Sequence, residues 1–302
     1  MYSSRTCNTD SIYQIRDFLV NTFRRFPEKT NWLIDRLNFS FSVSRVFNAV
    51  SEAEYCSRIR IWEKDGEICS VVNAEGENRG EAFFQLNTLE PERALLQEMF
   101  EFTESHLMVK KDDKQVVYLA ISKKADTIVT MAMERGYEKE AWSEITCKKD
   151  IGERNDIVLP EGYQIKTALE TTPEARAAAH SFAFGYNDRN DTVMRSVEAF
   201  NELQKMKDYR RELDIQVTDS NGMVAAFATM WFDAANGIGI LEPVGTHPKQ
   251  RRMGLAKAAI LHAENLISDL GGTHIYVGSD QEFYKQIGFY ECSEDYIYKL
   301  ER

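Results

Sequence analysis

The sequence predicts an α/β fold with mixed sheets, built from two similar units in tandem. Its 302 residues are enough for about two domains of ordinary size. Apolar runs typical of strands and amphipathic runs typical of helices follow in a similar order in the two halves. Between the halves, the polar segment 150–162 contains Gly152, Pro160 and Gly162 and is typical of a linker. We therefore expect one domain at 1–150 and a second at 160–302.

The first half starts its pattern with a hairpin. Two strand-like runs flank Asp65-Gly66, and this kind of turn needs positive φ, which glycine adopts without strain. A third apolar run leads through Pro91 into an amphipathic segment. In order, the predicted elements are strands at 58–62, 68–72 and 81–86, a helix at 92–106, a strand at 116–121, a short helix ending in Arg135-Gly136-Tyr137 and a closing strand at 141–147.

The second half repeats this order with Asn221-Gly222 as the hairpin turn. Its third strand runs into Pro243 and Pro248 before the long helix starts. In order, the predicted elements are strands at 213–218, 223–231 and 238–241, a helix at 252–270, a strand at 273–277, a short helix ending in Ile287-Gly288-Phe289 and a closing strand at 296–300. Each half is thus expected to end with a strand of its own sheet.

The helix predicted at 252–270 has one apolar face and begins with an unusual sequence. Its apolar residues recur at spacings of three and four, at Leu255, Ala256, Ala259, Ile260, Ala263, Leu266 and Ile267. Lys257, Glu264 and Asp269 lie off this face, and Gly271-Gly272 is a plausible end. Arg251, Arg252 and Gly254 are therefore expected at the front of a packed helix. Because the first N–H groups of a helix are unbonded and its N-terminus is positive, this is an anion site.

Composition excludes several classes of protein. The net charge is −11, and both halves are acidic: residues 1–150 carry 21 basic and 25 acidic side chains, and residues 151–302 carry 16 and 23. We therefore expect no nucleic-acid partner. No apolar run reaches the ~20 residues of a membrane span, and the start of the chain lacks the layout of a secretory signal. Five scattered cysteines without C-x-x-C spacing, and histidines without ligand spacing, indicate reduced thiols, no metal site and a cytoplasmic protein.

Two motifs in the second half resemble those of one family. Arg251-x-x-Gly254-x-Ala256, between a strand and a helix, is similar to the Q/R-x-x-G-x-G/A pattern of GNAT-type N-acetyltransferases. About thirty residues further on, Phe283-Tyr284-Lys285-Gln286-Ile287-Gly288-Phe289 resembles the F-Y-x-x-x-G-F segment of the same superfamily. The resemblance covers roughly residues 162–302 and extends to the first half in outline only. It implies two GNAT-like acyl-CoA N-acyltransferase units in tandem, as in mycothiol synthase.

The resemblance implies that acetyl-CoA binds as co-substrate, with its pyrophosphate at the helix N-terminus. Gly254 would let the backbone approach a phosphate, and Arg251 and Arg252 would add charge-assisted hydrogen bonds. Val244 and Thr246 would offer backbone groups to the pantetheine arm and the acetyl carbonyl, on a strand edge that Pro243 and Gly245 make irregular. The expected cofactor-binding residues are Val244, Thr246, Arg251, Arg252, Met253, Gly254, Leu255 and Ala256.

The resemblance also suggests two catalytic residues. Tyr284 lies where the family usually carries a tyrosine that protonates the departing thiolate, although a core tyrosine is the alternative. Glu242 would accept a proton from the substrate ammonium, directly or through water, although a solvated glutamate is nearly as plausible. His247, Trp231 and Phe232 are better explained as turn and core residues. The loop at 184–191 is a candidate cover for the acceptor.

The corresponding place in the first half lacks this chemistry. Residues 89–96 contain no glycine, and Glu90 and Glu92 would repel a phosphate there. We therefore predict one working site, and an N-acetyltransferase that moves an acetyl group to a small-molecule or peptide amine by direct transfer in a ternary complex. The alternative is a non-catalytic acetyl-CoA sensor or assembly module of the same fold. The sequence does not identify the acceptor, the acyl chain length or the oligomeric state.

Overall fold

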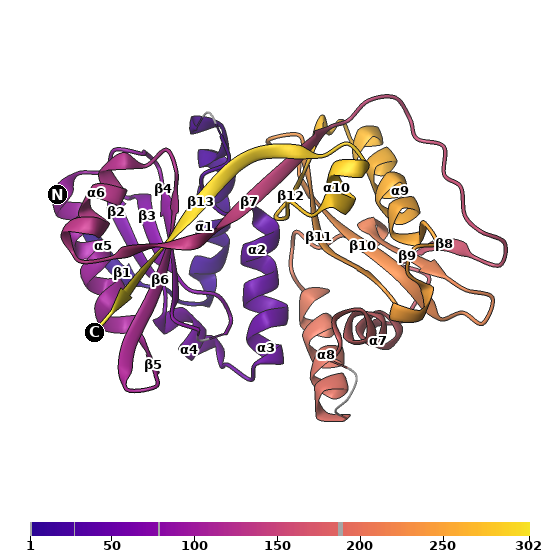
Figure 1. Cartoon of the computed structure of the whole chain (residues 1–302), viewed down its shortest axis with the longest axis horizontal. Helices are drawn as coiled ribbons and strands as arrows, with labels where there is room; N and C mark the ends of the chain where they lie inside the picture. Colours follow the sequence, from indigo (N-terminus) through magenta and orange to yellow (C-terminus); the bar gives the residue numbers. More distant parts are fainter. Residues whose placement is uncertain (1, 27, 78, 187–189) are drawn as a thin grey trace. The chain divides into compact units, whose positions relative to one another are not determined.

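The computed structural model describes residues 2–302 except 27, 78 and 187–189, with residues 190–194 described by their backbone alone. Its strands and helices form the predicted mixed α/β fold (Figure 1). The chain divides into two compact units: Met1–Leu33, Asn48–Thr146 and Glu291–Arg302 form the first, and Ile34–Phe47 and Cys147–Tyr290 form the second. The predicted ranges are 1–150 and 160–302, but residues 34–47 and 147–150 lie in the second unit and residues 291–302 in the first.

The first unit contains a mixed sheet in the order β1-β2-β3-β4-β6-β13-β7, with β5 paired to β6. Among the described strand pairs, β4 with β6 is parallel, and β1–β2, β2–β3, β3–β4, β5–β6 and β6–β13 are antiparallel. Its strands are β1 (Ser3–Thr6), β2 (Arg60–Lys64), β3 (Glu67–Asn73), β4 (Glu81–Leu86), β5 (Val109–Lys111), β6 (Lys114–Ser122), most of β7 (Glu138–Asp150) and most of β13 (Tyr290–Glu301).

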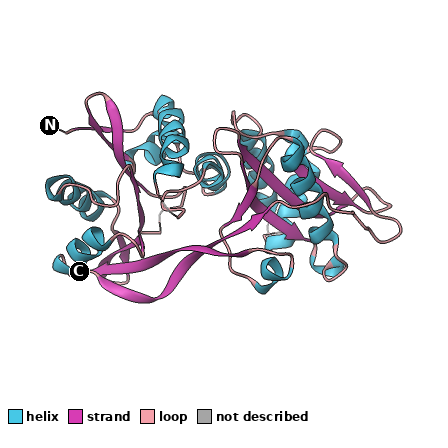
Figure 2. Ribbon diagram, turned by 90° about the horizontal axis from the view of Figure 1, so that it is seen from above, coloured by secondary structure: helices cyan, strands magenta, loops and turns pink. Residues whose placement is uncertain are grey.

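Helices cover the sheet of the first unit on both sides (Figure 2). They are α1 (Thr9–Thr22), α4 (Glu52–Ser57), α5 (Arg93–His106) and α6 (Asp126–Glu134). The apolar faces of α5 and α6 bury Leu96, Phe100 and Ile128 in one core with Val72 and Leu119 of the strands. The helix predicted at 92–106 is therefore present, and it is held by the amphipathic face that predicted it.

The second unit contains a mixed sheet in the order β7-β12-β11-β10-β9-β8. β11 and β12 are parallel, with Ile238, Gly239 and Ile240 opposite His274, Ile275 and Tyr276. The other strands pair antiparallel with their neighbours. The strands are the end of β7, β8 (Gln164–Thr167), β9 (Asp214–Thr218), β10 (Val224–Asp233), β11 (Ile238–Thr246) and β12 (His274–Val277).

The helices of the second unit include two from the first half of the sequence. They are α2 (Ile34–Phe39), α3 (Arg45–Phe47), α7 (Pro173–Phe184), α8 (Asn190–Leu203), α9 (Leu255–Asp269) and α10 (Glu282–Gln286). Helix α9 begins three residues later than predicted. Its apolar face is buried as expected, but Glu264, expected off that face, is 2% exposed and pairs with Lys149 at 2.7 Å. The carboxylate tolerates burial because an ammonium accompanies it.

The closing strands do not pair as predicted. β13, expected to close the second half, pairs antiparallel with β6, with Tyr296 opposite Ile121 and Leu300 opposite Val117. The end of β7 instead pairs with β12, with Cys147 opposite Val277. Alternating apolar residues predict a half-buried strand but do not specify its neighbour, so the exchange could not be read from the pattern.

The segment predicted as a linker is anchored on the second unit. Between β7 and β8 it forms no helix or strand. Arg154 pairs with Asp269 at 2.7 Å, and the backbone N–H of Asn155 donates to the Asn265 side chain at 2.8 Å. Across the described part of the chain, no helix is long and apolar enough to cross a membrane.

Candidate active site

The loop between β11 and α9 combines a short turn with two residues of left-handed backbone. Pro248–Gln250 form a single 3₁₀ turn, and Arg252 and Gly254 have φ values of 64° and 80°. Gly254 is the N-cap residue of α9, and no side chain caps the helix there. The first N–H groups of a 15-residue helix therefore remain available to a ligand. Glycine suits this position because other residues rarely adopt positive φ.

This helix start lies in a cavity of about 510 Å³. The lining comes from the α7 end, the β11 end, the loop, the first turn of α9 and α10: Ala183, Phe184, Val244, Gly245, Thr246, Gln250, Arg251, Arg252, Gly254, Leu255, Ala256, Lys257, Gln281, Phe283 and Tyr284. Three of these side chains are cationic and none is acidic. Together with the positive end of the helix dipole, they make the cavity suitable for an anion.

Gly245 and Gly254 both line the cavity, but the lack of a side chain serves a different purpose at each position. A Cβ on Gly254 would meet nothing within 4 Å, so this backbone faces open space that a ligand can approach. A Cβ on Gly245 would lie 2.4 Å from the Phe227 ring and 2.7 Å from the Ala183 Cβ. Gly245 therefore serves close packing of β11 against α7 and β10, whereas Gly254 serves the open helix start.

The irregularity of β11 lies two residues before the position of Gly245. β10 pairs Ala228 with Val244 and Met230 with Leu241, so Thr229 alone faces Glu242 and Pro243. This is a β-bulge of the kind that often re-aims side chains next to active sites. The recorded pairing of β11 with β12 ends at Ile240 and Tyr276. Beyond that pair, β11 turns its edge toward the cavity at Val244 and Thr246.

Tyr284 is the one residue with an acidic proton among the lining residues from α10. Its side chain is 8% exposed and packs edge-on against Phe283 and Phe289, with ring centroids 5.2 and 5.8 Å away. Burial raises the pKa of the Tyr284 hydroxyl above its ordinary value, and the negative charge of Glu242 raises it further. Tyr284 is therefore protonated at neutral pH and suited to donate a proton.

Most predicted site residues line one cavity, and two do not. Val244, Thr246, Arg251, Arg252, Gly254, Leu255, Ala256 and Tyr284 line it. Met253 is 41% exposed, and its sulfur accepts from the Tyr163 hydroxyl at 3.8 Å. Glu242 is half-buried in the bulge, outside the lining, and its carbonyl accepts from Trp231 Nε1 at 2.7 Å.

Arg251 connects the loop to α7. Its Nη2 donates to the Ala183 carbonyl at 3.0 Å, and its Nε donates to the Thr246 carbonyl at 3.4 Å. The guanidinium thus ties the loop to the end of α7 and to β11 while remaining exposed. Arg252 and Lys257 also line the cavity, and both are exposed to solvent.

Sequence reasoning missed several lining residues. Ala183 comes from α7, and no local signal links that helix to a loop more than sixty residues away, whereas Phe184 is the first residue of the candidate cover. The spacing of Lys257 places it off the apolar face, and its position in the first turn of α9 is the signal that would have found it. Of the candidate cover at 184–191, residues 187–189 lie outside the described residues. His247 accepts from the Lys249 N–H at 3.3 Å and lies against Phe182, which is a turn-forming role.

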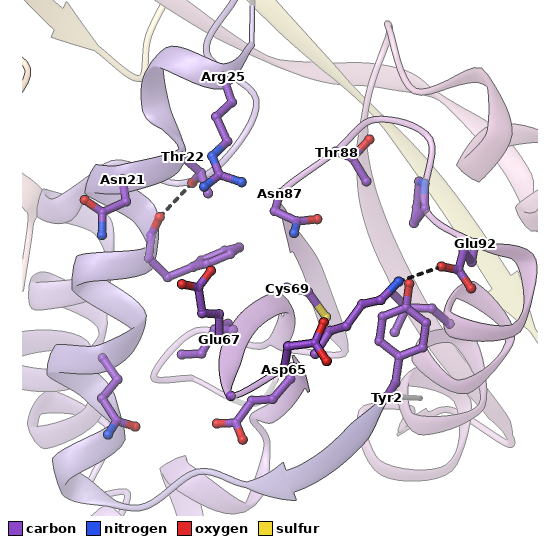
Figure 3. Close-up of a pocket in the computed structure, with 18 of the residues that line it drawn as sticks. Tyr2, Asn21, Thr22, Arg25, Asp65, Glu67, Cys69, Asn87, Thr88 and Glu92 are labelled. Carbon is purple, nitrogen blue, oxygen red and sulfur yellow. Dashed lines mark hydrogen bonds and ion pairs between the residues drawn. The ribbon is translucent and has the colours of Figure 1, made fainter.

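The first unit has a larger cavity, of about 1270 Å³, around the corresponding loop (Figure 3). Glu90, Pro91 and Glu92 line it, and Glu92 pairs with Lys64 at 3.1 Å. Asp65 and Glu67 of the hairpin also line it. Its lining includes six acidic residues against three basic ones, the opposite of the cavity in the second unit. Within the described residues, no group of His, Cys, Asp and Glu is arranged to hold a metal ion.

Residues 165–292 match the model of the acetyltransferase (GNAT) family. The chain therefore contains a GNAT-type domain in its second half, and the resemblance of the two motifs is confirmed for that segment. Among curated proteins, none matches this chain.

Solved structures with this fold match both halves at low identity. A tandem GNAT protein from the clavulanic acid biosynthesis pathway has a TM-score of 0.64 at 11% identity, covering 100% of this chain and 98% of that one. A GCN5-related N-acetyltransferase from Sphaerobacter thermophilus has a TM-score of 0.62 at 14% identity, covering 99% and 95%. A glucosamine N-acetyltransferase region of a fungal multi-domain β-N-acetylglucosaminidase has a TM-score of 0.59 at 11% identity, covering 99% and 38%. The tandem GNAT fold is thus confirmed.

Proposed function

We propose that the second unit binds acetyl-CoA in the 510 Å³ cavity and transfers its acetyl group to an amine. The observation that carries this proposal is the uncapped start of α9, where left-handed Gly254 opens onto a cavity with three cations and no carboxylate. This arrangement fits the pyrophosphate of the cofactor by charge and by free N–H donors. The edge of β11 at Val244 and Thr246 fits the amide groups of the pantetheine arm.

Tyr284 in the cavity and Glu242 in the adjoining bulge supply the groups that the chemistry needs. Acetyl-CoA supplies an activated thioester. Glu242 accepts a proton from the substrate ammonium, directly or through water, so that the amine nitrogen has a free electron pair. As the new C–N bond forms and the C–S bond breaks, Tyr284 donates its proton to the sulfur. Direct transfer needs no acyl carrier on the protein, and the five cysteines are not among the lining residues.

The acceptor is proposed to be a small-molecule or peptide amine, and the location of the protein is proposed to be the cytoplasm. All five cysteines are free thiols, which suits a reducing compartment. The acidic net charge of −11 suits an acceptor that is cationic before it reacts.

An amine panel tests the proposed function. Purified protein is incubated with acetyl-CoA and a series of polyamines, amino sugars, aminoglycosides and peptides with free amino groups, and thiol release and product mass are measured. The expected result is amine-dependent thiol release by the wild type and none by Gly254→Glu. Tight binding of acetyl-CoA without transfer to any acceptor would support a sensor instead. Absence of binding would overturn the proposal.

A further inference from the structure

The bulge that carries Glu242 lies opposite buried residues of β10, and one of them bonds to it. On β11, the carbonyl of Glu242 accepts a hydrogen bond from Trp231 Nε1 at 2.7 Å. On β10, the residue facing the bulge is Thr229, which is 1% exposed. The regular ladder is interrupted here, and the Trp231 N–H supplies a hydrogen bond that fixes the local backbone.

Thr229 is held by a buried ion pair. Its hydroxyl donates to Asp214 Oδ1 at 2.9 Å and accepts from Arg176 Nη2 at 3.0 Å, and Arg176 Nε lies 3.0 Å from the same carboxylate. Arg176 and Asp214 are 1% and 0% exposed. A buried pair of this kind is costly to form but geometrically strict, because any lost contact leaves a charge without compensation.

Trp231 connects that network with the bulge. Tyr209 donates to Asp214 Oδ2 at 2.7 Å, and its ring packs edge-on against Trp231 with a centroid distance of 6.1 Å. Trp231 is itself 1% exposed, so the indole has one well-defined place in the core. Its N–H then reaches the Glu242 carbonyl. The indole therefore links Asp214 and Tyr209 to the backbone from which the Glu242 side chain projects.

We propose that Trp231 is a positioning residue that holds Glu242 beside Tyr284 through the bulge of β11. This role deepens the proposed function and rests on it for its catalytic meaning. Trp231 itself does not line the cavity and touches no reacting atom. Its effect passes through the backbone of Glu242, in the way that hydrogen bonds behind a site orient the groups in front.

The test variant is Trp231→Phe, which retains an aromatic core residue and removes the N–H. The matched control is Trp62→Phe in the first unit, because Trp62 is also 1% exposed and its Nε1 also donates to one partner, Glu98, at 2.9 Å. Both variants lose one indole hydrogen bond of similar length, so Trp62→Phe controls for the general effect of removing such a bond from the fold. We expect kcat to fall about tenfold in Trp231→Phe. A positioned acid–base group increases the rate about 10²–10⁴-fold, and only part of this increase should be lost when Glu242 is displaced but still present. In Trp231→Phe, the KM for acetyl-CoA should stay within about twofold of the wild-type value. In Trp62→Phe, kcat should also stay within about twofold of the wild-type value.

A second measurement works whether or not an acceptor is found. The tyrosines are replaced by 3-fluorotyrosine, and the ¹⁹F resonance of residue 284 is assigned as the one missing in Tyr284→Phe. We expect this resonance to titrate at lower pH in Trp231→Phe than in the wild type, in the same direction as in Glu242→Gln, and to be unchanged in Trp62→Phe. If Trp231→Phe changed neither the titration of residue 284 nor kcat, Trp231 would serve only core packing and the proposal would be wrong. A wild type without transfer activity would refute the proposed function, while the titration would still decide the placement of Glu242.

Discussion

The two units use the same scaffold with loops of different length. In each, a parallel pair of strands has three paired positions, β4 with β6 and β11 with β12. A proline follows eight residues after the last paired residue, at Pro91 and at Pro248. The next long helix starts two residues after Pro91 but seven after Pro248, at Arg93 and at Leu255. The five additional residues of the second unit contain Arg251, Arg252 and Gly254, so the proposed anion site depends on the loop and not on the shared scaffold.

The difference extends to the short helix near the end of each unit. Gly136 and Gly288 both end a helix with positive φ, and the following residues, Tyr137 and Phe289, donate their N–H to the carbonyls of Ala132 and Tyr284. The matching hydrogen bonds make Ala132 the counterpart of Tyr284. The first unit therefore has an alanine where the second unit carries the proposed proton donor, in addition to lacking the five loop residues.

The largest expected effect comes from Gly254→Glu. The side chain would enter the open space before α9 with a negative charge, at a φ that glutamate rarely adopts. We expect the Kd for acetyl-CoA to rise by about two orders of magnitude or more, since a like charge in a site costs several kcal/mol. Isothermal titration calorimetry measures this, with Gly66→Glu as control. Gly66 has a φ of 84°, open space and a place in the cavity of the first unit. Equal affinity in the two variants would remove the α9 start from the cofactor site.

A smaller effect is expected from Tyr284→Phe. Removal of the proton donor should lower kcat about 10²-fold, the lower end of the range for a general acid, and change the Kd for acetyl-CoA about twofold at most. Steady-state rates and calorimetry separate the two quantities. Tyr298→Phe is the control, since Tyr298 is a buried tyrosine of the first unit. A wild-type rate in Tyr284→Phe would show that solvent protonates the leaving sulfur.

Glu242→Gln is expected to change the pH dependence. Transfer is lost as the pH rises through the pKa of Tyr284, because the donor ionises. Burial is the larger cause that raises this pKa, and the charge of Glu242 is the smaller one. Neutralising Glu242 should therefore move the alkaline limb of kcat to lower pH, and loss of the base should reduce kcat about tenfold. A rate profile from neutral to alkaline pH measures both. A limb that moves to higher pH would contradict this arrangement.

Sequence patterns predicted the parts of this structure that depend on local chemistry. The helix at 92–106, the hairpins at Gly66 and Gly222, and the loop that gathers Arg251 and Gly254 all follow from spacing, turn residues and helix-start rules. The patterns failed where distant segments meet. Neither the pairing of β13 with β6 nor the approach of Ala183 to Gly245 has a local signal, because each depends on packing between segments far apart in the chain. The bulge at Glu242 was expected in outline at Pro243 and Gly245, but its register needed the partner strand.

The edge of β4 in the first unit gives the last comparison and the smallest expected effect on cofactor binding. At Leu86, the N–H donates to the Asn31 side chain at 2.8 Å, and the carbonyl accepts from it at 2.7 Å. Asn31 is 4% exposed, so in the first unit a buried side chain hydrogen-bonds the strand edge at Leu86. In the second unit, the strand edge at Val244 faces the cavity instead.

Asn31→Ala should therefore destabilise the first unit by about 2–4 kcal/mol, because it leaves two buried backbone groups of Leu86 without these partners. Urea denaturation measures the loss, with exposed Asn21→Ala on the preceding helix as control. The affinity for acetyl-CoA should stay within about twofold, and the stoichiometry should remain one per chain. If Asn31→Ala bound a second equivalent of acetyl-CoA, the Asn31 side chain alone would be what prevents the first unit from binding the cofactor. A stoichiometry of one would show that the missing loop residues exclude the cofactor even when the strand edge is free.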